Sequence, residues 1–227
     1  MIESLDGKIS TGDIDELDID KDFKKIEGVK EGLQQYYDIE KNTDIFSLNS
    51  GRVMAKIGVN TNTDEPKKSV CSFIIIDNLP HLDLNGVKYL SKWAKDLFIV
   101  TTNNNHPAFL IKEKNIKNIF YEKEIDFTNL FYKLKTDYQI DRITIQSGGT
   151  LNAQFLRLGL IDEVSIVVAP CLIGGSKTQS LIGGESFHSQ EDLFKIKALK
   201  LKECKVLENS YLHVLYEVVN DTKTSLD

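Results

Sequence analysis

The amino-acid sequence predicts an α/β fold of three layers, in which helices cover both faces of a mixed, mostly parallel sheet. Two observations lead to this fold class. Runs of β-branched and aromatic residues alternate with helical segments through the middle of the chain, a rhythm typical of crossover units between parallel strands. Near the C-terminus, two strand-like runs follow each other without an intervening helix, which predicts a closing antiparallel pair.

The elements of the N-terminal third are the least regular. The acidic run 13–22 has the composition of a solvated loop, because it lacks the glycine and the closing glutamate of a calcium-binding loop at the required offsets. Residues 26–37 follow as a predicted helix that two glycines weaken. A short strand is predicted at 45–48, and Gly51 to Met54 form a turn that opens a helical segment.

The remaining two thirds have clearer boundaries. Phe127, Leu130, Phe131 and Leu134 recur at the spacing of the apolar face of a helix. Short apolar runs that end at Asn, Pro or Gly are typical of buried strands. The predicted strands are 71–77, 97–101, 118–121, 142–146, 163–169, 194–207 and 211–219, and the further predicted helices are 87–95, 106–114 and 151–158.

Composition limits the classes of function. The 227 residues are 41% hydrophobic with a formal net charge of −6, so we expect a single domain over residues 1–227. Its basic residues are scattered, which argues for a small-molecule partner and against nucleic acid. No apolar run approaches the roughly 20 residues that span a bilayer, and the N-terminus has no signal-peptide core. We expect a soluble cytoplasmic protein without a membrane partner.

Cysteine and histidine spacings indicate no metal site. The three cysteines are far apart and form no C-x-x-C pair, so we expect free thiols in a reducing compartment. The four histidines have no spacing typical of metal ligands. No resident metal is therefore expected.

A glycine pair marks the most informative segment. The strand 142–146 runs into Ser147, Gly148, Gly149 and Thr150, and a helix begins directly behind them. Glycines let a backbone approach a ligand closely, and the first amide groups of a helix attract anions. The same pattern also serves as a plain tight turn, so local sequence leaves both interpretations open. Farther on, the polar loop 176–180 between two glycine pairs either folds over a cofactor or is a surface connection.

The stretch from Arg142 to Gly175 resembles the C-terminal reductase domain of the bifunctional riboflavin-biosynthesis protein and related dihydrofolate-reductase-family proteins. The matching residues are Gly148, Gly149, Thr150, Leu151, Asn152, Phe155, Leu156, Gly159, Leu160, Ile161, Asp162, Glu163, Ala169 and Pro170. Residues 4–9 are similar to the family's Ser-Leu-Asp-Gly-Lys-Ile motif at the nicotinamide and substrate. Residues 51–53 and 97–102 are similar to its segments beside the cofactor phosphates and the adenosine.

The resemblance implies a dihydrofolate-reductase-like fold, NADPH as cofactor and a homodimer. It also implies the site residues. Those expected at the cofactor are Gly51, Arg52, Thr101, Thr102, Gly148, Gly149, Thr150 and Leu151. Ser4 and Arg52 are expected to contact substrate, and Asp6 is the best remaining acid for a catalytic role, although Asp6-Gly7 is also a common turn pair.

Departures from the family pattern bear on the substrate. Ser147 stands where riboflavin-pathway reductases have a glutamate, and Arg52, Val53, Met54 and Lys56 replace a threonine and an acidic residue. The first hypothesis is an NADPH-dependent reductase of a small heterocyclic substrate, similar to 5-amino-6-(5-phosphoribosylamino)uracil reductase. The alternatives are a catalytically degenerate nucleotide-binding protein of the same fold and a pterin or dihydrofolate reductase.

Overall fold

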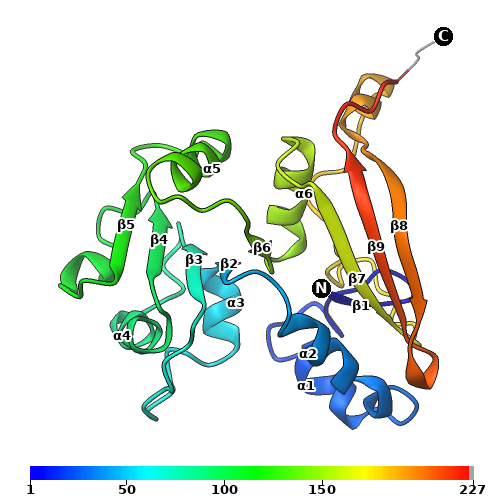
Figure 1. Ribbon diagram of the computed structural model, residues 1–227, viewed down its shortest axis with the longest axis horizontal. Coiled ribbons are helices and arrows are strands. Elements are labelled where there is room, and N and C mark those ends of the chain that lie inside the picture. The colour runs from blue at the N-terminus through cyan, green and yellow to red at the C-terminus, as the bar shows by residue number, and fades with distance from the viewer. Residues whose placement is uncertain (225–227) are drawn as a thin grey trace. The chain divides into compact units, whose positions relative to one another are not determined.

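The computed structural model describes residues 1–224 and confirms the α/β class (Figure 1). Its strands form two sheets, with the orders β5-β4-β3-β2-β6 and β1-β7-β9-β8. The strands are β1 (Ile2–Ser4), β2 (Phe46–Ser50), β3 (Ser72–Ile76), β4 (Leu97–Thr101), β5 (Ile116–Phe120), β6 (Thr144–Ile145), β7 (Glu163–Ala169), β8 (Ala198–Val206) and β9 (Leu212–Val219). The helices are α1 (Ile19–Asp22), α2 (Gln34–Glu40), α3 (Gly51–Lys56), α4 (Leu84–Trp93), α5 (Phe127–Thr136) and α6 (Gly149–Arg157). Short 3₁₀ helices cover Phe23–Lys25, Lys30–Gly32, Pro107–Leu110, Gln190–Lys195 and Glu208–Ser210.

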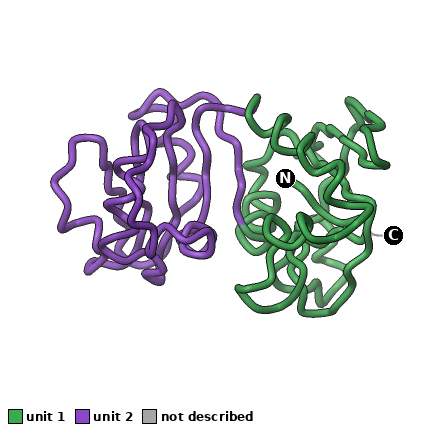
Figure 2. The backbone as a smooth tube through the Cα atoms, turned by 90° about the horizontal axis from the view of Figure 1, so that it is seen from below, with its two compact units in different colours: residues 1–42, 148–227 green, residues 43–147 purple. Residues whose placement is uncertain are grey.

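The chain divides into two compact units (Figure 2). The central unit is Thr43–Ser147, and the terminal unit combines Met1–Asn42 with Gly148–Asp227. Each sheet belongs to one unit, so the five parallel strands β5-β4-β3-β2-β6 and the closing antiparallel pair lie in separate sheets. The expectation of one domain over residues 1–227 stays a prediction.

The central unit is a parallel sheet buried on both faces. Every residue of β3 and β4 is buried, as expected when layers cover both faces of a parallel sheet. On one face, Phe73 and Ile99 pack in a cluster with residues of α4. On the other face, the Phe98 ring meets Tyr138, just behind α5, edge to face with 4.9 Å between the ring centroids. The three predicted layers are therefore present in this unit.

The terminal unit is closed by an antiparallel pair, as predicted. Strand β1 pairs parallel to β7, with Ile2 opposite Val167, and β9 pairs antiparallel to both β7 and β8. The core on one face of this sheet holds Phe23 and Tyr211, which are fully buried. The Tyr211 hydroxyl donates to the Val29 carbonyl at 2.6 Å, so the ring anchors the N-terminal segment to the hairpin.

Several predictions of local structure were wrong in part. The strand expected at 194–207 begins only at Ala198, because a capped 3₁₀ helix covers Gln190–Lys195. The helix expected at 26–37 begins only at Gln34, because Gly28 has a φ of +81° that a right-handed helix cannot contain. The helix expected at 106–114 is a single 3₁₀ turn that ends as the backbone becomes extended at Ile111. The acidic run contains the short helix α1, because Asp18 caps its N-terminus and Ile19 is buried. Within residues 1–224, no helix is long and apolar enough to cross a membrane.

Candidate functional site

The residues predicted to bind the cofactor divide between the two units. Gly51, Arg52, Thr101 and Thr102 belong to the central unit. Gly148 to Leu151 belong to the terminal unit, together with Ser4 and Asp6. We describe the two groups in turn.

The carboxyl edge of the central sheet brings its four predicted residues together. Strands β2, β3 and β4 are parallel neighbours, with Ser50 opposite Ile76 and Ile76 opposite Val100. The segments that leave these strands therefore lie side by side at one edge. Ligands of open α/β sheets bind outside this edge.

Gly51 is required by a close contact at this edge. A Cβ atom added to Gly51 would lie 2.3 Å from the Asp77 carboxyl carbon, so no larger residue fits without a shift. The Ser50 hydroxyl accepts a hydrogen bond from the Val53 amide at 3.2 Å and caps α3. Met54, one of the departures from the family pattern, is buried in the core behind the turn.

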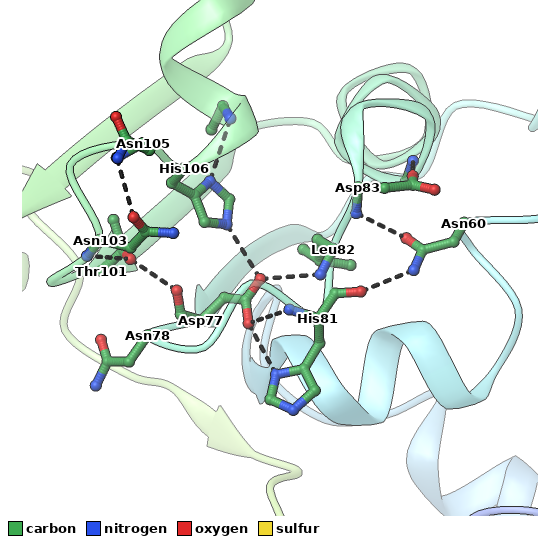
Figure 3. Close-up of polar contacts among 12 residues, drawn as sticks. Asn60, Asp77, Asn78, His81, Leu82, Asp83, Thr101, Asn103, Asn105 and His106 are labelled. Carbon is green, nitrogen blue, oxygen red and sulfur yellow. Dashed lines mark hydrogen bonds and ion pairs between the residues drawn. The ribbon is translucent and has the colours of Figure 1, made fainter.

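Asp77 is the centre of a polar network (Figure 3). Its carboxylate accepts from the His81 and Leu82 amides at 3.1 and 3.0 Å and contacts both histidine rings, His81 Nδ1 at 3.1 Å and His106 Nε2 at 3.0 Å. Burial raises the pKa of Asp77, but hydrogen bonds from His106, Leu82 and His81 outweigh it and hold the pKa below its ordinary value. The carboxylate is thus ionised and saturated with donors.

His106 is held in one tautomer. Its ring is fully buried, and Nδ1 accepts a hydrogen bond from the Ala108 amide at 3.1 Å. Because Nδ1 accepts, the ring proton sits on Nε2 and is donated to Asp77. A neutral imidazole therefore links the 3₁₀ turn after β4 to the end of β3.

The Thr101 hydroxyl is hydrogen-bonded to other groups of the protein. The group donates to the Asp77 carbonyl at 2.7 Å and accepts from the Asn103 amide at 3.0 Å, and the side chain is fully buried. The next amide, that of Thr102, donates to Asn78 Oδ1 at 3.1 Å. Contact of these threonines with a cofactor stays a prediction, and Thr102 is the more accessible of the two.

In the terminal unit, α6 begins with unpaired donors. Gly148 caps the helix without a side-chain hydrogen bond. Within the part of the chain that the structure describes, no acceptor pairs with the amide groups of Thr150 and Leu151. Thr150 is exposed, so these donors and the positive end of the helix dipole are suited to an anion.

Gly149 is required for packing within the protein, whereas Gly148 is partly exposed. A Cβ atom added there would lie 2.1 Å from the Ser180 carbonyl oxygen, so the segment that approaches this glycine is part of the chain itself. At Gly148 the nearest neighbour of such an atom is the Gln179 side chain at 3.8 Å, an ordinary contact. Of the two glycines, Gly148 therefore faces the freer space.

Residues 178–184, here called the strap, join the turn after β1 to the start of α6. The Leu181 amide donates to the Gly7 carbonyl at 3.1 Å, and the Gly183 amide donates to the Gly149 carbonyl at 3.0 Å. Lys8 Nζ donates to the Thr178 carbonyl and to the Ser180 hydroxyl, each at 3.2 Å. The polar loop of the sequence analysis is thus anchored at its end rather than a loose surface connection.

Asp6 is bound to the loop after β7. Its carboxylate accepts from the Ser4 hydroxyl at 2.5 Å and from the Ile173 and Gly174 amides at 3.0 and 2.6 Å. The bond from Ser4 and those from the two amides lower the pKa of Asp6 to about 2. A carboxyl group of this pKa is ionised at neutral pH, so the environment does not favour Asp6 as a proton donor. Substrate contact by Ser4, which is fully buried, stays a prediction.

Sequence reasoning assigned no individual role to Asp77, His106 or Lys8. Asp77 directly follows the apolar run Phe73 to Ile76, which was the available signal, since an acid at the carboxyl edge of a buried strand faces either a ligand or a partner. The pairing with His106, which is 29 residues away, has no sequence signal. In residues 1–224, no group of three or more His, Cys, Asp or Glu side chains could hold a metal ion.

Comparisons with known proteins agree with the fold. The profile of the RibD C-terminal domain family matches residues 1–213. The chain is similar to the 2,5-diamino-6-ribosylamino-4(3H)-pyrimidinone 5′-phosphate reductase of Methanothermobacter thermautotrophicus, with 34% identity over 58 residues. This alignment covers 26% of the chain and only 27% of that relative.

Two solved structures have the same fold. RibD of Acinetobacter baumannii superposes with a TM-score of 0.64 at 18% identity, over 96% of this chain and 56% of that one. The riboflavin biosynthesis reductase of Saccharomyces cerevisiae superposes with a TM-score of 0.59 at 16% identity, over 96% of this chain and 87% of that one. At these identities the likeness is one of fold.

Proposed function

The chain belongs to the RibD C-terminal domain family, and on that premise we propose that it is an NADPH-dependent reductase of a small heterocyclic substrate. The substrate class that the relatives' names suggest is a ribosylamino-pyrimidine phosphate, as in 5-amino-6-(5-phosphoribosylamino)uracil reductase. The observation that carries the proposal is the start of α6, where unpaired amides of Thr150 and Leu151 follow the open Gly148. This arrangement is suited to the phosphates of a dinucleotide.

The proposal gives each group of predicted site residues a separate role. Bound NADPH would supply a hydride to the acceptor carbon of the substrate. The phosphates would be bound over Gly148 to Leu151 of the terminal unit. A role of Gly51, Arg52, Thr101 and Thr102 of the central unit in nucleotide binding stays a prediction from the family resemblance. Because the Asp6 carboxylate is already ionised, it would hold the turn after β1 in place, and the proton would come from water or substrate.

Titration of NADPH, followed by nicotinamide fluorescence, tests the proposal. The wild type is expected to bind saturably, and Gly148→Ala is expected to weaken binding, since its methyl group enters the space above the turn. Gln154→Ala, an exposed change farther along α6, is the control and should bind like the wild type. Absence of saturable binding by the wild type would refute the proposal.

A nucleotide-binding protein without catalysis is the second candidate. Two departures from the family favour it: Ser147 replaces a glutamate and is buried, and Met54 is part of the core. Binding without NADPH oxidation across pyrimidine, pteridine and simple carbonyl substrates would favour this candidate. Turnover of dihydrofolate would instead identify a pterin or folate reductase.

We also propose a cytoplasmic homodimer. The three cysteines are free thiols, which suits a reducing compartment. One face of β8 exposes Leu199, Leu201 and Val206 at 46%, 54% and 81% of their surface. Leu201 lies opposite Tyr216 of β9, and Tyr216 lies opposite Val164 of β7, so an apolar row continues across the sheet. An exposed apolar sheet face of this kind favours association with a second copy.

A further inference from the structure

We propose that Asp77 and His106 are positioning residues for the nucleotide, acting through the three segments that leave the carboxyl edge of the central sheet. The inference rests on the proposed function, since it assumes that this edge binds the cofactor. It adds that the affinity of the edge depends on a buried pair that touches no ligand.

Asp77 contacts all three segments at once. Its carboxyl group fills the space beside Gly51, where an added Cβ atom would lie 2.3 Å from the carboxyl carbon. The same group accepts from the amides of His81 and Leu82 in the segment between β3 and α4. It also contacts the His81 ring in that segment and the His106 ring at the end of the segment that leaves β4 (Figure 3).

The segment after β4 depends on this contact for its shape. Between Thr101 and His106, the Asn103 amide donates to Thr101 Oγ1 at 3.0 Å, and the Asn105 amide donates to Asn103 Oδ1 at 3.0 Å. The Thr102 amide donates to Asn78 Oδ1 at 3.1 Å in the neighbouring segment. The links from this segment to Asp77 are the Thr101 hydroxyl at one end, which donates to the main-chain carbonyl, and the His106 ring at the other, which contacts the carboxylate. Asp77 therefore fixes both ends of the loop that carries Thr102.

Stability alone is a weak reason for such a pair. Removing a carboxylate from water is costly, and well-packed apolar side chains are often equally stable in place of a buried polar pair. The network instead fixes the geometry of the segments. Four donors, namely the His81 amide and ring, the Leu82 amide and the His106 ring, converge on one carboxylate and hold their segments beside it. A preorganised edge binds a nucleotide without first ordering its loops.

Two substitutions at His106 each keep one of its two hydrogen bonds and remove the other. In His106→Gln, the side-chain amide reaches the position of Nε2 and can still donate to Asp77. In His106→Asn, the shorter side chain takes the place of Nδ1, accepts from the Ala108 amide and no longer reaches Asp77. Both variants remove the ring, so they match each other in lost apolar volume to within one methylene.

The experiment measures the NADPH dissociation constant, the KM for NADPH and kcat for the wild type and both variants. We expect His106→Asn to weaken binding and raise KM about tenfold, with kcat within about twofold of the wild type, because displaced loops lose affinity. His106→Gln should restore most of the affinity. Ser91→Ala, which removes a hydrogen bond elsewhere in the central unit, is the control and should bind like the wild type.

The outcomes separate this inference from the proposed function. If the wild type binds no NADPH, the proposed function fails and the inference fails with it. If the wild type binds and folded His106→Asn binds equally well, or if both variants lose affinity equally, only the inference is overturned. Should His106→Asn be unfolded, Asp77→Asn keeps the size of the side chain but replaces one acceptor oxygen by an amide, and unchanged affinity of that folded variant would overturn the inference in its place.

Discussion

Two adjacent glycines at the start of α6 have different environments, which predicts different costs of substitution. Gly149→Ala would place a methyl group 2.1 Å from the Ser180 carbonyl oxygen and displace the strap. We expect a loss of about 1–3 kcal/mol in the free energy of unfolding, the usual range for overpacking. Gly148→Ala is the matched control and should change it little, because φ is −73° and the nearest neighbour is 3.8 Å away. Urea unfolding measures both, and equal losses would contradict the contact.

The carboxylate of Asp6 predicts a dependence of stability on pH. Its pKa is about 2 in the folded protein, below the ordinary value of about 3.9. Folding therefore favours the ionised form, so this contribution is complete above about pH 4 and is lost as the pH falls toward 2. Asp6→Asn should lower the free energy of unfolding at pH 6 and lose less of it on acidification. Parallel curves for the two proteins between pH 6 and pH 3 would show that Asp6 makes no such contribution.

At the scale of elements, the boundaries of helices and strands were predicted best where tertiary contacts agree with the local sequence pattern. Strand β4 was predicted at 97–101, as observed, because an apolar run of four residues is followed by Thr101 and bounded by polar residues. Helix α4 begins three residues before the predicted 87, since Asp83 caps it by accepting from the Gly86 amide. The segments 26–37 and 106–114 failed because glycine conformation and burial of single side chains, not periodicity, decide their course.

For the candidate site, the sequence predicts which residues lie at strand ends but not their long-range contacts. Parallel pairing of β2, β3 and β4 necessarily gathers Gly51 and Thr101 at one edge, and both had been selected by family resemblance. The contacts of Gly149 with Ser180 and of Asp77 with His106 join residues about 30 positions apart, and only folded packing establishes them. The low pKa of Asp6 arises first from the nearby Ser4 hydroxyl and then from the amides of Ile173 and Gly174, which are far away in sequence.

The strap is the element whose anchoring can be tested most directly. Lys8→Met keeps the aliphatic stem but removes both hydrogen bonds from Nζ, to the Thr178 carbonyl and the Ser180 hydroxyl. We expect hydrogen exchange at the Leu181 and Gly183 amides to accelerate about tenfold, since a hydrogen bond from a charged donor contributes roughly 1.5 kcal/mol or more. Lys177→Met, an exposed neighbour, is the control. Unchanged exchange in Lys8→Met would show that the backbone bonds alone hold the strap.

At the scale of the whole molecule, the exposed face of β8 predicts the oligomeric state. The wild type is expected to be a dimer, and Leu201→Lys should produce a monomer, because a charge in the apolar row would be desolvated on association. Lys200→Ala changes the adjacent residue, which points to the opposite side of the strand, and should leave the dimer intact. Light scattering coupled to gel filtration measures the mass. A wild-type monomer would refute the proposed dimer, and a dimeric Leu201→Lys would place its interface elsewhere.

The pairing of β1 with β7 has a consequence for biosynthesis. Ile2 is opposite Val167, so the first strand leaves the ribosome long before its partner exists. At about 5–20 residues per second, it waits on the order of ten seconds or more. During that interval the strands of the central unit, which pair only with one another, are completed first. The N-terminal segment, with the apolar side chains of Phe23 and Tyr36, therefore lacks its native packing partners until β7 and β9 have been synthesised.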